Sequence, residues 1–292
     1  MSTLANRDFV KMNGLGNEIV IVDLRHAPSL AHSAIAAGEA RAAARQEPYD
    51  QLMALYPGRG AADAAVRIYN NDGSEAGACG NGMRCVASLI SAETGKATLN
   101  FETAAGLVCC WRADAGLFTV DMGAPRLRWN EIPLAQDMPD TRAIDLSFGP
   151  SDAPLLRAPA AVNMGNPHVI FWVDNPRAYD LRAIGPVLEH HPLFPERANI
   201  TLAATPARDR IVIRTWERGA GLTKACGSAA CAAAVAAARL GRTGRKVTVT
   251  LPGGDLAIAW READDHVLMT GPVEYEHAGR FDAALVADAG AA

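Results

Sequence analysis

Apolar and polar residues alternate along short runs in both halves of the chain, a pattern typical of half-buried β-strands. In the first half these runs cover residues 9–10, 19–22, 66–69, 99–101, 107–111 and 118–121. In the second half they cover residues 169–173, 211–216, 247–251, 256–260 and 267–269. We therefore predict that each half is mostly sheet.

Each half also contains one long apolar segment that is predicted to be a helix. The segments are residues 81–94, followed by Gly95, and residues 228–240, followed by Gly241. A glycine just past the last turn is a common helix stop. The second helix is apolar on nearly every side, so it must be buried, and a sheet wrapped around it is the natural covering. Residues 31–45 are predicted to form an Ala/Arg-rich surface helix.

The two halves repeat one another around a Cys-Gly pair. When Cys79 is set on Cys226, the aligned pairs are Arg67 with Arg214, Tyr69 with Trp216 and Asn70 with Glu217. A repeat of this length predicts two related domains. We place the N-terminal domain at residues 1–125 plus 273–292 and the C-terminal domain at residues 126–272.

Each predicted domain offers one thiol. If the domains pack about a pseudo-twofold axis, the two thiols approach a shared cleft from opposite sides. A substrate held there has an acid on one face and a base on the other, an arrangement that inverts a stereocentre.

Composition limits the classes of partner. The 292 residues are 49% hydrophobic and 21% charged, and the net charge of −4 is spread along the chain. No basic stripe indicates a nucleic-acid surface, so a small molecule is the expected partner. No segment resembles a signal peptide or reaches membrane-spanning length, which predicts a cytoplasmic protein with no membrane partner and six free thiols.

The cysteines admit other interpretations. Zinc ligands are usually two to four residues apart, whereas Cys79 and Cys85 have five residues between them, so no metal is expected. Buried structural cysteine is the expected state for Cys85, Cys109, Cys110 and Cys231. Many racemases use pyridoxal phosphate bound to a lysine, but none of the four lysines lies in an obvious phosphate-binding context. We therefore favour a route without a cofactor.

Cys79 and Cys226 differ from the other cysteines in position. Each lies where a Gly-rich loop enters a helix, and unpaired N–H groups and the helix dipole favour negative charge there. We expect this position to lower the pKa of both thiols. The same N–H groups, from Gly80-Asn81 and Gly227-Ser228, could hold a carboxylate as charge develops on it during removal of an α-proton.

Seven segments of the chain resemble the diaminopimelate epimerase family, and they follow one another in the family's order. They are NGLGNEIVIVD from Asn13, YDQLM from Tyr49, NNDGSEAGACGNGMRC from Asn70, NMGNPHVIFWVD from Asn163, FPERANI from Phe194, ERGAGLTKACGSAAC from Glu217 and LPGGDL from Leu251. The resemblance implies an α/β fold of the α+β roll type. Its two pseudo-symmetric domains each have a mainly antiparallel sheet rolled around a central helix.

The resemblance also implies an activity and a set of site residues. The family interconverts LL- and meso-diaminopimelate without a cofactor in lysine and peptidoglycan precursor synthesis, and a homodimer is expected. Cys79 and Cys226 match the acid/base pair, and His168 and Glu217 match the residues that tune the two thiols. The positions that match substrate-contacting residues are Asn17, Gln51, Asn70, Gly80, Asn81, Asn166, Asn199, Glu217, Arg218, Gly227 and Ser228.

The planar fork of Arg218 suits a carboxylate at the non-reacting end of such a substrate. The chain departs from the family pattern at Leu222, Ala229 and His277, and none of these departures removes a predicted catalytic group. Two alternatives remain. One is a proline or hydroxyproline racemase, which shares the two-cysteine logic but needs no second carboxylate site. The other is an inactive homologue that serves as a binding module.

Overall fold

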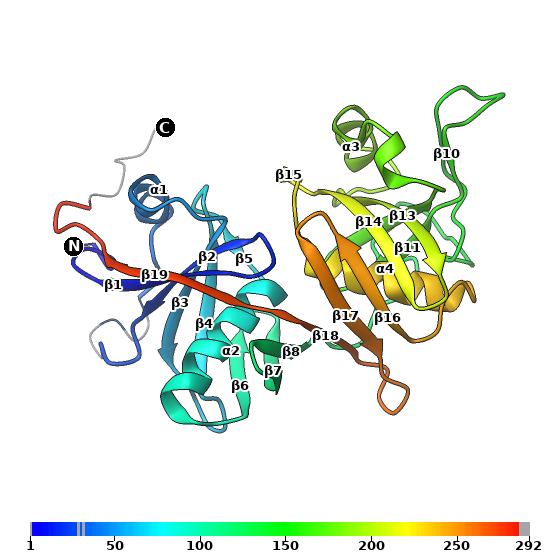
Figure 1. Ribbon diagram of the computed structural model, residues 1–292. Helices are drawn as coiled ribbons and strands as arrows, with labels where there is room; N and C mark the ends of the chain where they lie inside the picture. The colour runs from blue at the N-terminus through cyan, green and yellow to red at the C-terminus, as the bar shows by residue number, and fades with distance from the viewer. Residues whose placement is uncertain (1, 28–29, 31–32, 286–292) are drawn as a thin grey trace. The chain divides into compact units, whose positions relative to one another are not determined.

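The computed structural model describes residues 2–27, 30 and 33–285, and the chain divides into two compact units. Unit 1 comprises Met1–Val120 and Gly271–Ala292, and unit 2 comprises Asp121–Thr270 (Figure 1). Each unit contains one of the two Cys-Gly pairs. The domain boundaries that we expect from the sequence, at residues 125/126 and 272/273, lie within a few residues of the unit boundaries and remain a prediction.

Unit 1 is a curved sheet with two helices. Its elements are β1 (Asp8–Asn13), β2 (Glu18–Asp23), α1 (Ala37–Gln46), β3 (Gln51–Pro57), β4 (Ala64–Asn70), β5 (Glu75–Ala76), α2 (Gly80–Thr94), β6 (Thr98–Thr103), β7 (Gly106–Asp114), β8 (Leu117–Asp121) and β19 (Glu274–Arg280). β19 returns from the end of the chain and pairs with β1 in antiparallel sense.

Unit 2 opens with a long stretch of loops and then repeats this order. Its elements are β9 (Ser147–Phe148), β10 (Leu156–Arg157), β11 (Ala160–Asn163), β12 (Pro167–Trp172), the 3₁₀ turn η2 (Pro176–Ala178), α3 (Leu181–Glu189), β13 (Asn199–Ala207), β14 (Arg210–Glu217), β15 (Gly221–Leu222), α4 (Gly227–Arg239), β16 (Lys246–Leu251), β17 (Gly254–Trp260) and β18 (Val267–Pro272).

The strands of the two units pair in the same sequence and the same sense. β1–β2, β3–β4, β4–β5, β6–β7 and β7–β8 are antiparallel, whereas β2–β3 and β4–β6 are parallel. The pairs β11–β12, β12–β13, β13–β14, β14–β15, β14–β16, β16–β17 and β17–β18 repeat that pattern. The register repeats as well: Ile19 lies opposite Gln51 in unit 1, and His168 lies opposite Asn199 in unit 2. The repeat read from the sequence is therefore a repeat of topology.

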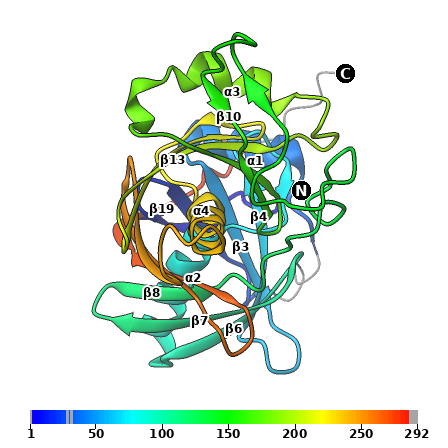
Figure 2. The ribbon, with the colours of Figure 1, turned by 90° about the vertical axis from the view of Figure 1, so that its right-hand side faces the viewer.

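Each sheet wraps around the helix that follows its Cys-Gly pair. α2 contacts β2, β3, β6 and β7, and α4 contacts β11, β12, β13, β14, β16 and β17 (Figure 2). The α4 residues from Ala229 to Ala237 are at most 3% exposed. α2 ends at Gly95, which has φ 73°, the left-handed conformation that glycine adopts without strain. The predicted fold class, mainly antiparallel sheets rolled around central helices, is confirmed.

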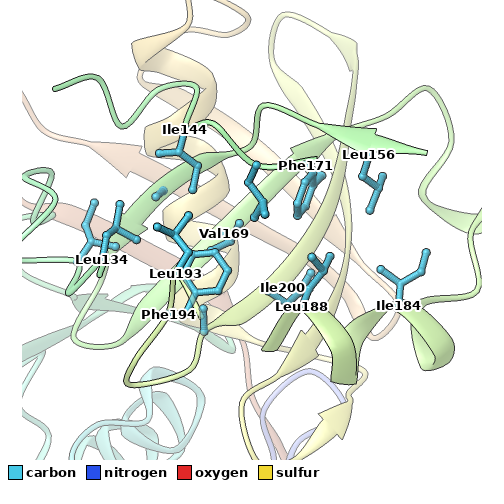
Figure 3. Close-up of a cluster of buried hydrophobic side chains, with 14 of the residues drawn as sticks. Leu134, Ile144, Leu156, Val169, Phe171, Ile184, Leu188, Leu193, Phe194 and Ile200 are labelled. Atoms are coloured by element: carbon cyan, nitrogen blue, oxygen red, sulfur yellow. The ribbon is translucent and has the colours of Figure 1, made fainter. Parts of the chain in front are cut away.

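A second apolar layer, called the outer core below, covers the outer face of the unit 2 sheet. α3 and the loops that open the unit pack there against Val169, Phe171 and Ile200 of the sheet (Figure 3). Phe171 is fully buried and is the last but one residue of β12, whose residues Pro167 to Phe171 are all buried. A strand covered on both faces has few polar positions, because neither face meets water.

The strands and helices predicted from the sequence are present in the structure, but several others were not predicted, among them β3, β11, α3, β13 and β19, and α1 begins later than expected. The sequence predicted a surface helix over residues 31–45, but α1 begins at Ala37, and residues 31–32 lie outside the described residues. α1 lies at the surface with Ala37, Arg45 and Gln46 exposed, and its other face, Gly38 to Ala40 with Ala42 and Ala43, is buried against the unit 1 core. Along the described ranges, no helix is both long enough and apolar enough to cross a membrane.

Candidate functional site

Cys79 is the N-cap residue of α2 in unit 1. Its Sγ accepts a hydrogen bond from the Gly82 amide at 3.2 Å, and its thiol donates to Asn17 Oδ1 at 3.8 Å. Glycine is needed at position 82, because an added Cβ would lie 2.7 Å from Met53 Sδ and 3.3 Å from the Cys79 sulfur. The helix start therefore fits closely around a half-buried thiol.

The predicted polar residues of unit 1 lie at strand ends close to this helix start. Asn17 immediately precedes β2, and its Nδ2 donates to Asp50 Oδ2 at 2.9 Å. Gln51 begins β3 opposite Asn70, the last residue of β4, and its Nε2 donates to Asn70 Oδ1 at 3.1 Å. Asn81 is 3% exposed, and its Oδ1 accepts from Arg84 Nη1 at 3.0 Å. The buried Asn81 side chain is therefore bonded within α2, and the Asn81 backbone N–H is the group that a ligand could use.

Cys226 is the N-cap residue of α4 in unit 2 and is 5% exposed. Its Sγ lies 3.5 Å from Ser228 Oγ, and it also makes a hydrogen bond with the Glu217 carboxylate. Glu217 is the last residue of β14, the place that Asn70 takes in unit 1. The Thr223 hydroxyl donates to Glu217 Oε1. The structure therefore brings Glu217 to Cys226, as predicted.

The expectation of a lowered thiol pKa was wrong for Cys226. Burial raises the pKa of the Cys226 thiol well above its usual range, and the adjacent Glu217 carboxylate raises it further. Hydrogen bonds from Ser228 and the Ala229 amide lower the pKa, but they do not offset burial and a neighbouring negative charge. In the free protein Cys226 is therefore a neutral thiol, the form that donates a proton.

His168 is fully buried in β12 and is neutral at physiological pH. Burial, and to a smaller extent the positive charge of Arg218, lowers the pKa of His168 to about 3. Its Nε2 lies 2.8 Å from Asn166 Oδ1, an acceptor, which assigns the ring proton to Nε2. Nδ1 has no hydrogen-bond partner within the described residues. The buried His168 ring thus fixes the orientation of the Asn166 side-chain amide by this hydrogen bond.

Acid is expected to destabilise unit 2 through His168. Because the pKa of His168 is lowered in the folded state, its contribution is complete above the unfolded pKa of about 6.5 and is lost as the pH falls toward 3. In His168→Gln, which keeps a side-chain N–H donor, the loss of unfolding free energy between pH 8 and pH 5 should be smaller by about 2 kcal/mol. Urea melts at both pH values measure this. A His168 ring that titrates near pH 6.5 by NMR would contradict it.

A cavity of about 470 Å³ lies in unit 2 beside these residues. Its lining includes Asn166, Pro167 at the start of β12, Arg126 from the opening loops, and Glu196 and Arg218. Asn199 Oδ1 accepts from the Arg218 amide at 2.9 Å, and the Arg218 guanidinium donates to the Glu196 carbonyl at 2.8 Å. The lining also includes Glu131, so two arginines stand beside two glutamates, and this polar cavity suits a ligand that carries both a carboxylate and an amino group.

Asn199 itself is 2% exposed, and both ends of its amide are bonded, since Nδ2 donates to the Pro167 carbonyl at 2.9 Å. It therefore ties β12 to the turn that carries Arg218. Sequence reasoning missed Thr223 and Asp50, which hold Glu217 and Asn17. Both lie within matched or adjacent segments, but a lone Thr or Asp carries no signal of its own.

The remaining cysteines follow the sequence prediction in part. Cys85, Cys110 and Cys231 are fully buried, and burial raises the pKa of the Cys85 thiol to about 12. Cys109 is half-buried rather than buried, because it lies on β7, where neighbouring positions meet solvent. All six cysteines are free thiols, and among the residues that the structure describes no three His, Cys, Asp or Glu side chains form a metal-binding group.

Comparison with known proteins agrees with this arrangement. A family model described as diaminopimelate epimerase matches residues 9–128 and 160–276, most of both units. The chain belongs to the diaminopimelate epimerase family. A family member from Nitrobacter hamburgensis named diaminopimelate epimerase is 64% identical over 291 residues, covering 98% of this chain and 99% of that protein. One of the same name from Rhodopseudomonas palustris is 62% identical over 290 residues, covering 99% of each.

Solved structures show that the family fold extends to distant proteins. A predicted epimerase from Pseudomonas aeruginosa matches with a TM-score of 0.66 at 19% identity, covering 94% of this chain and 99% of that one. A hydroxyproline epimerase from Agrobacterium vitis, with bound trans-4-hydroxy-L-proline, matches with a TM-score of 0.65 at 15% identity, covering 96% of this chain and 94% of that one. At these identities the likeness concerns the fold alone.

Proposed function

We propose that this chain is a diaminopimelate epimerase, an isomerase that interconverts LL-2,6-diaminopimelate and meso-2,6-diaminopimelate. The observation that carries the proposal is that each unit sets a cysteine at the N-cap of its central helix, in a chain 62–64% identical over its length to proteins named for this activity. The reaction belongs to the synthesis of lysine and of peptidoglycan precursors. We further propose that the enzyme is a cytoplasmic homodimer.

In the proposed mechanism the two thiols exchange one proton each with the α-carbon. One cysteine, as thiolate, removes the α-proton, and the other, as neutral thiol, delivers a proton to the opposite face. The roles exchange when the reaction runs backward. The raised pKa of Cys226 suits it to begin as the acid in the free enzyme, which leaves Cys79 to act as the base in that direction.

Electrostatic stabilisation comes from the helix starts. Removal of the α-proton moves charge into the reacting carboxylate, and backbone N–H groups in the first turns of α2 and α4 can stabilise that charge. Those groups belong to Gly80-Asn81 and Gly227-Ser228. No metal and no cofactor are part of the proposal.

Recognition of the other end of the substrate is assigned to the polar residues at the strand ends. Arg218, on the cavity of unit 2, binds the distal carboxylate, with Asn166 beside it. The other predicted substrate-contacting positions are Gln51 and Asn70, Asn17 and Glu217, which lie against the two thiols, and Asn199, which holds the Arg218 backbone. A proline-type substrate has no distal carboxylate, so Arg218 favours diaminopimelate over that alternative.

An assay in deuterated water tests the proposal. LL-Diaminopimelate should be converted to the meso form with one deuterium at the inverted α-carbon, and LL substrate recovered early should carry none, because the base that takes the proton is not the acid that returns one. The carbonyl trap aminooxyacetate should leave the rate unchanged. Mass spectrometry and chiral chromatography follow both species.

The other outcomes separate the alternatives. Turnover of free L-proline without turnover of diaminopimelate would support a proline racemase. Binding of diaminopimelate without deuterium incorporation would support a binding module. Inhibition by the carbonyl trap would contradict the cofactor-independent route.

A further inference from the structure

The carboxylate of Glu189, the last residue of α3, spans the turn that follows β14. Glu189 is 3% exposed, and its Oε2 accepts from the Trp216 indole Nε1–H at 2.7 Å. Its Oε1 accepts from the Gly219 amide at 3.0 Å. These two donors stand on either side of Glu217 and Arg218, so one buried side chain holds both ends of the segment that carries them.

Packing fixes the indole in place for this contact. Gly185 lies one helical turn before Glu189, and an added Cβ there would lie 2.4 Å from the Trp216 ring. The turn itself is tight: Gly219 has φ 77°, and the Ala220 amide donates to the Glu217 carbonyl at 3.1 Å. α3 in turn is anchored by Leu181 and Leu188, which are buried in the outer core. The carboxylate is therefore presented from a rigid element.

An ion pair does not account for the burial of this carboxylate. Arg197 Nη1 is 3.7 Å from Glu189 Oε1, but the Arg197 side chain is 54% exposed. Exposed pairs at such distances contribute little. The hydrogen bonds to the indole and to the backbone amide are the contacts that satisfy the buried charge, and bonds to an ionised acceptor are stronger than neutral ones.

We propose that Glu189 is a positioning residue that holds the β14–β15 turn, keeping Glu217 against Cys226 and Arg218 on the cavity. Thr223 bonds the Glu217 carboxylate, and Asn199 bonds the Arg218 amide, but neither reaches the two flanks of the turn. The inference rests on the proposed function, since it assigns Glu189 a part in that same reaction.

Glu189→Gln tests the proposal, because glutamine has one acceptor oxygen where two donors need one each. Either the Trp216 indole N–H or the Gly219 amide N–H then faces the side-chain NH₂ group of glutamine instead of an acceptor, and the turn is expected to shift. We expect kcat/KM for diaminopimelate to fall about tenfold to a hundredfold, with KM raised through Arg218 and kcat lowered through Glu217. The pH midpoint for alkylation of Cys226, followed by peptide mapping, should move to lower pH as the Glu217 charge moves away.

Glu39→Gln is the matched control. Glu39 lies on α1 of unit 1, is also 3% exposed, and also accepts two hydrogen bonds, from the Ser2 hydroxyl and the Leu4 amide, but both reach Oε1, an oxygen that glutamine keeps. It holds the N-terminal segment rather than a turn with predicted site residues. The variant removes a buried carboxylate as Glu189→Gln does, and we expect kcat, KM and the alkylation profile of Cys226 to stay near wild type.

The outcomes distinguish this inference from the proposed function. If Glu189→Gln loses stability but, like the control, keeps wild-type kcat, KM and alkylation profile, Glu189 is structural and the inference is wrong. Should Glu189→Gln fail to fold, Trp216→Phe removes one donor, keeps the carboxylate, and should move kcat/KM and the alkylation midpoint in the same directions. If the wild type does not epimerise diaminopimelate, the proposed function fails, and the alkylation profile still decides whether Glu189 positions Glu217.

Discussion

Cys79→Ser and Cys226→Ser are each expected to lower kcat for diaminopimelate epimerisation by about 100-fold to 10,000-fold, the range for loss of a positioned acid or base. Serine has nearly the same shape as cysteine, so the N-cap at each helix start is retained. The serine hydroxyl is too weak an acid to replace the cysteine, either as the ionised base or as the proton donor. Steady-state kinetics with both stereoisomers measure the effect.

Cys109→Ser is the control for these two variants. Cys109 is half-buried on β7, so the substitution changes a thiol without opening a core or touching a helix start. It should leave kcat within about twofold, since surface changes away from a site have small effects. Near-normal turnover in either N-cap variant would refute the two-thiol mechanism. Circular dichroism checks that each variant is folded.

Phe171→Ala is expected to lower the free energy of unfolding of unit 2 by about 3–5 kcal/mol. Phe171 has no exposed surface and lies between β12 neighbours in the outer core of Figure 3, so truncation removes apolar burial and leaves a cavity. Trp129 and Trp216 pack against this core, which makes tryptophan fluorescence in urea a direct probe.

Phe171→Leu restores most of the lost volume and should recover much of that free energy. Equal stability of the alanine and leucine variants would show that the site collapses around the missing ring. A loss below about 1 kcal/mol for the alanine variant would contradict the burial of Phe171 in the outer core.

Much of the fold could be predicted from the sequence wherever one face of a strand meets water. β16 alternates exposed and buried positions, and its period is visible in the letters KVTVTL. β3 and β13 were missed because most of their positions are buried, so neither strand alternates regularly between apolar and polar residues. α3 was missed because Gly185 and Pro186 look like breakers, whereas the glycine makes room for the Trp216 ring.

The site was predictable to the level of residues but not of charge states. Cys79 and Cys226 follow from the repeat and from their place before apolar helices. The raised pKa of Cys226 does not, because it depends on burial and on the carboxylate of Glu217, nine positions earlier in the chain. The role of Glu189 could not be predicted either, since the Trp216 indole and the Gly219 amide come within hydrogen-bond distance of Glu189 only when α3 packs on β14.

The repeat of topology places different chemistry at equivalent positions. Asn70 closes β4 where Glu217 closes β14, and Ile19 stands in β2 where His168 stands in β12. The scaffold is duplicated but its charges are not, so the two thiols are chemically distinct. In the proposed mechanism the two stereoisomers therefore bind enzyme forms that differ in which cysteine carries the proton. kcat for the forward and reverse reactions should then peak at different pH values, while the two kcat/KM values keep one common pH profile, because their ratio is fixed by the equilibrium constant, which no arrangement of residues can move.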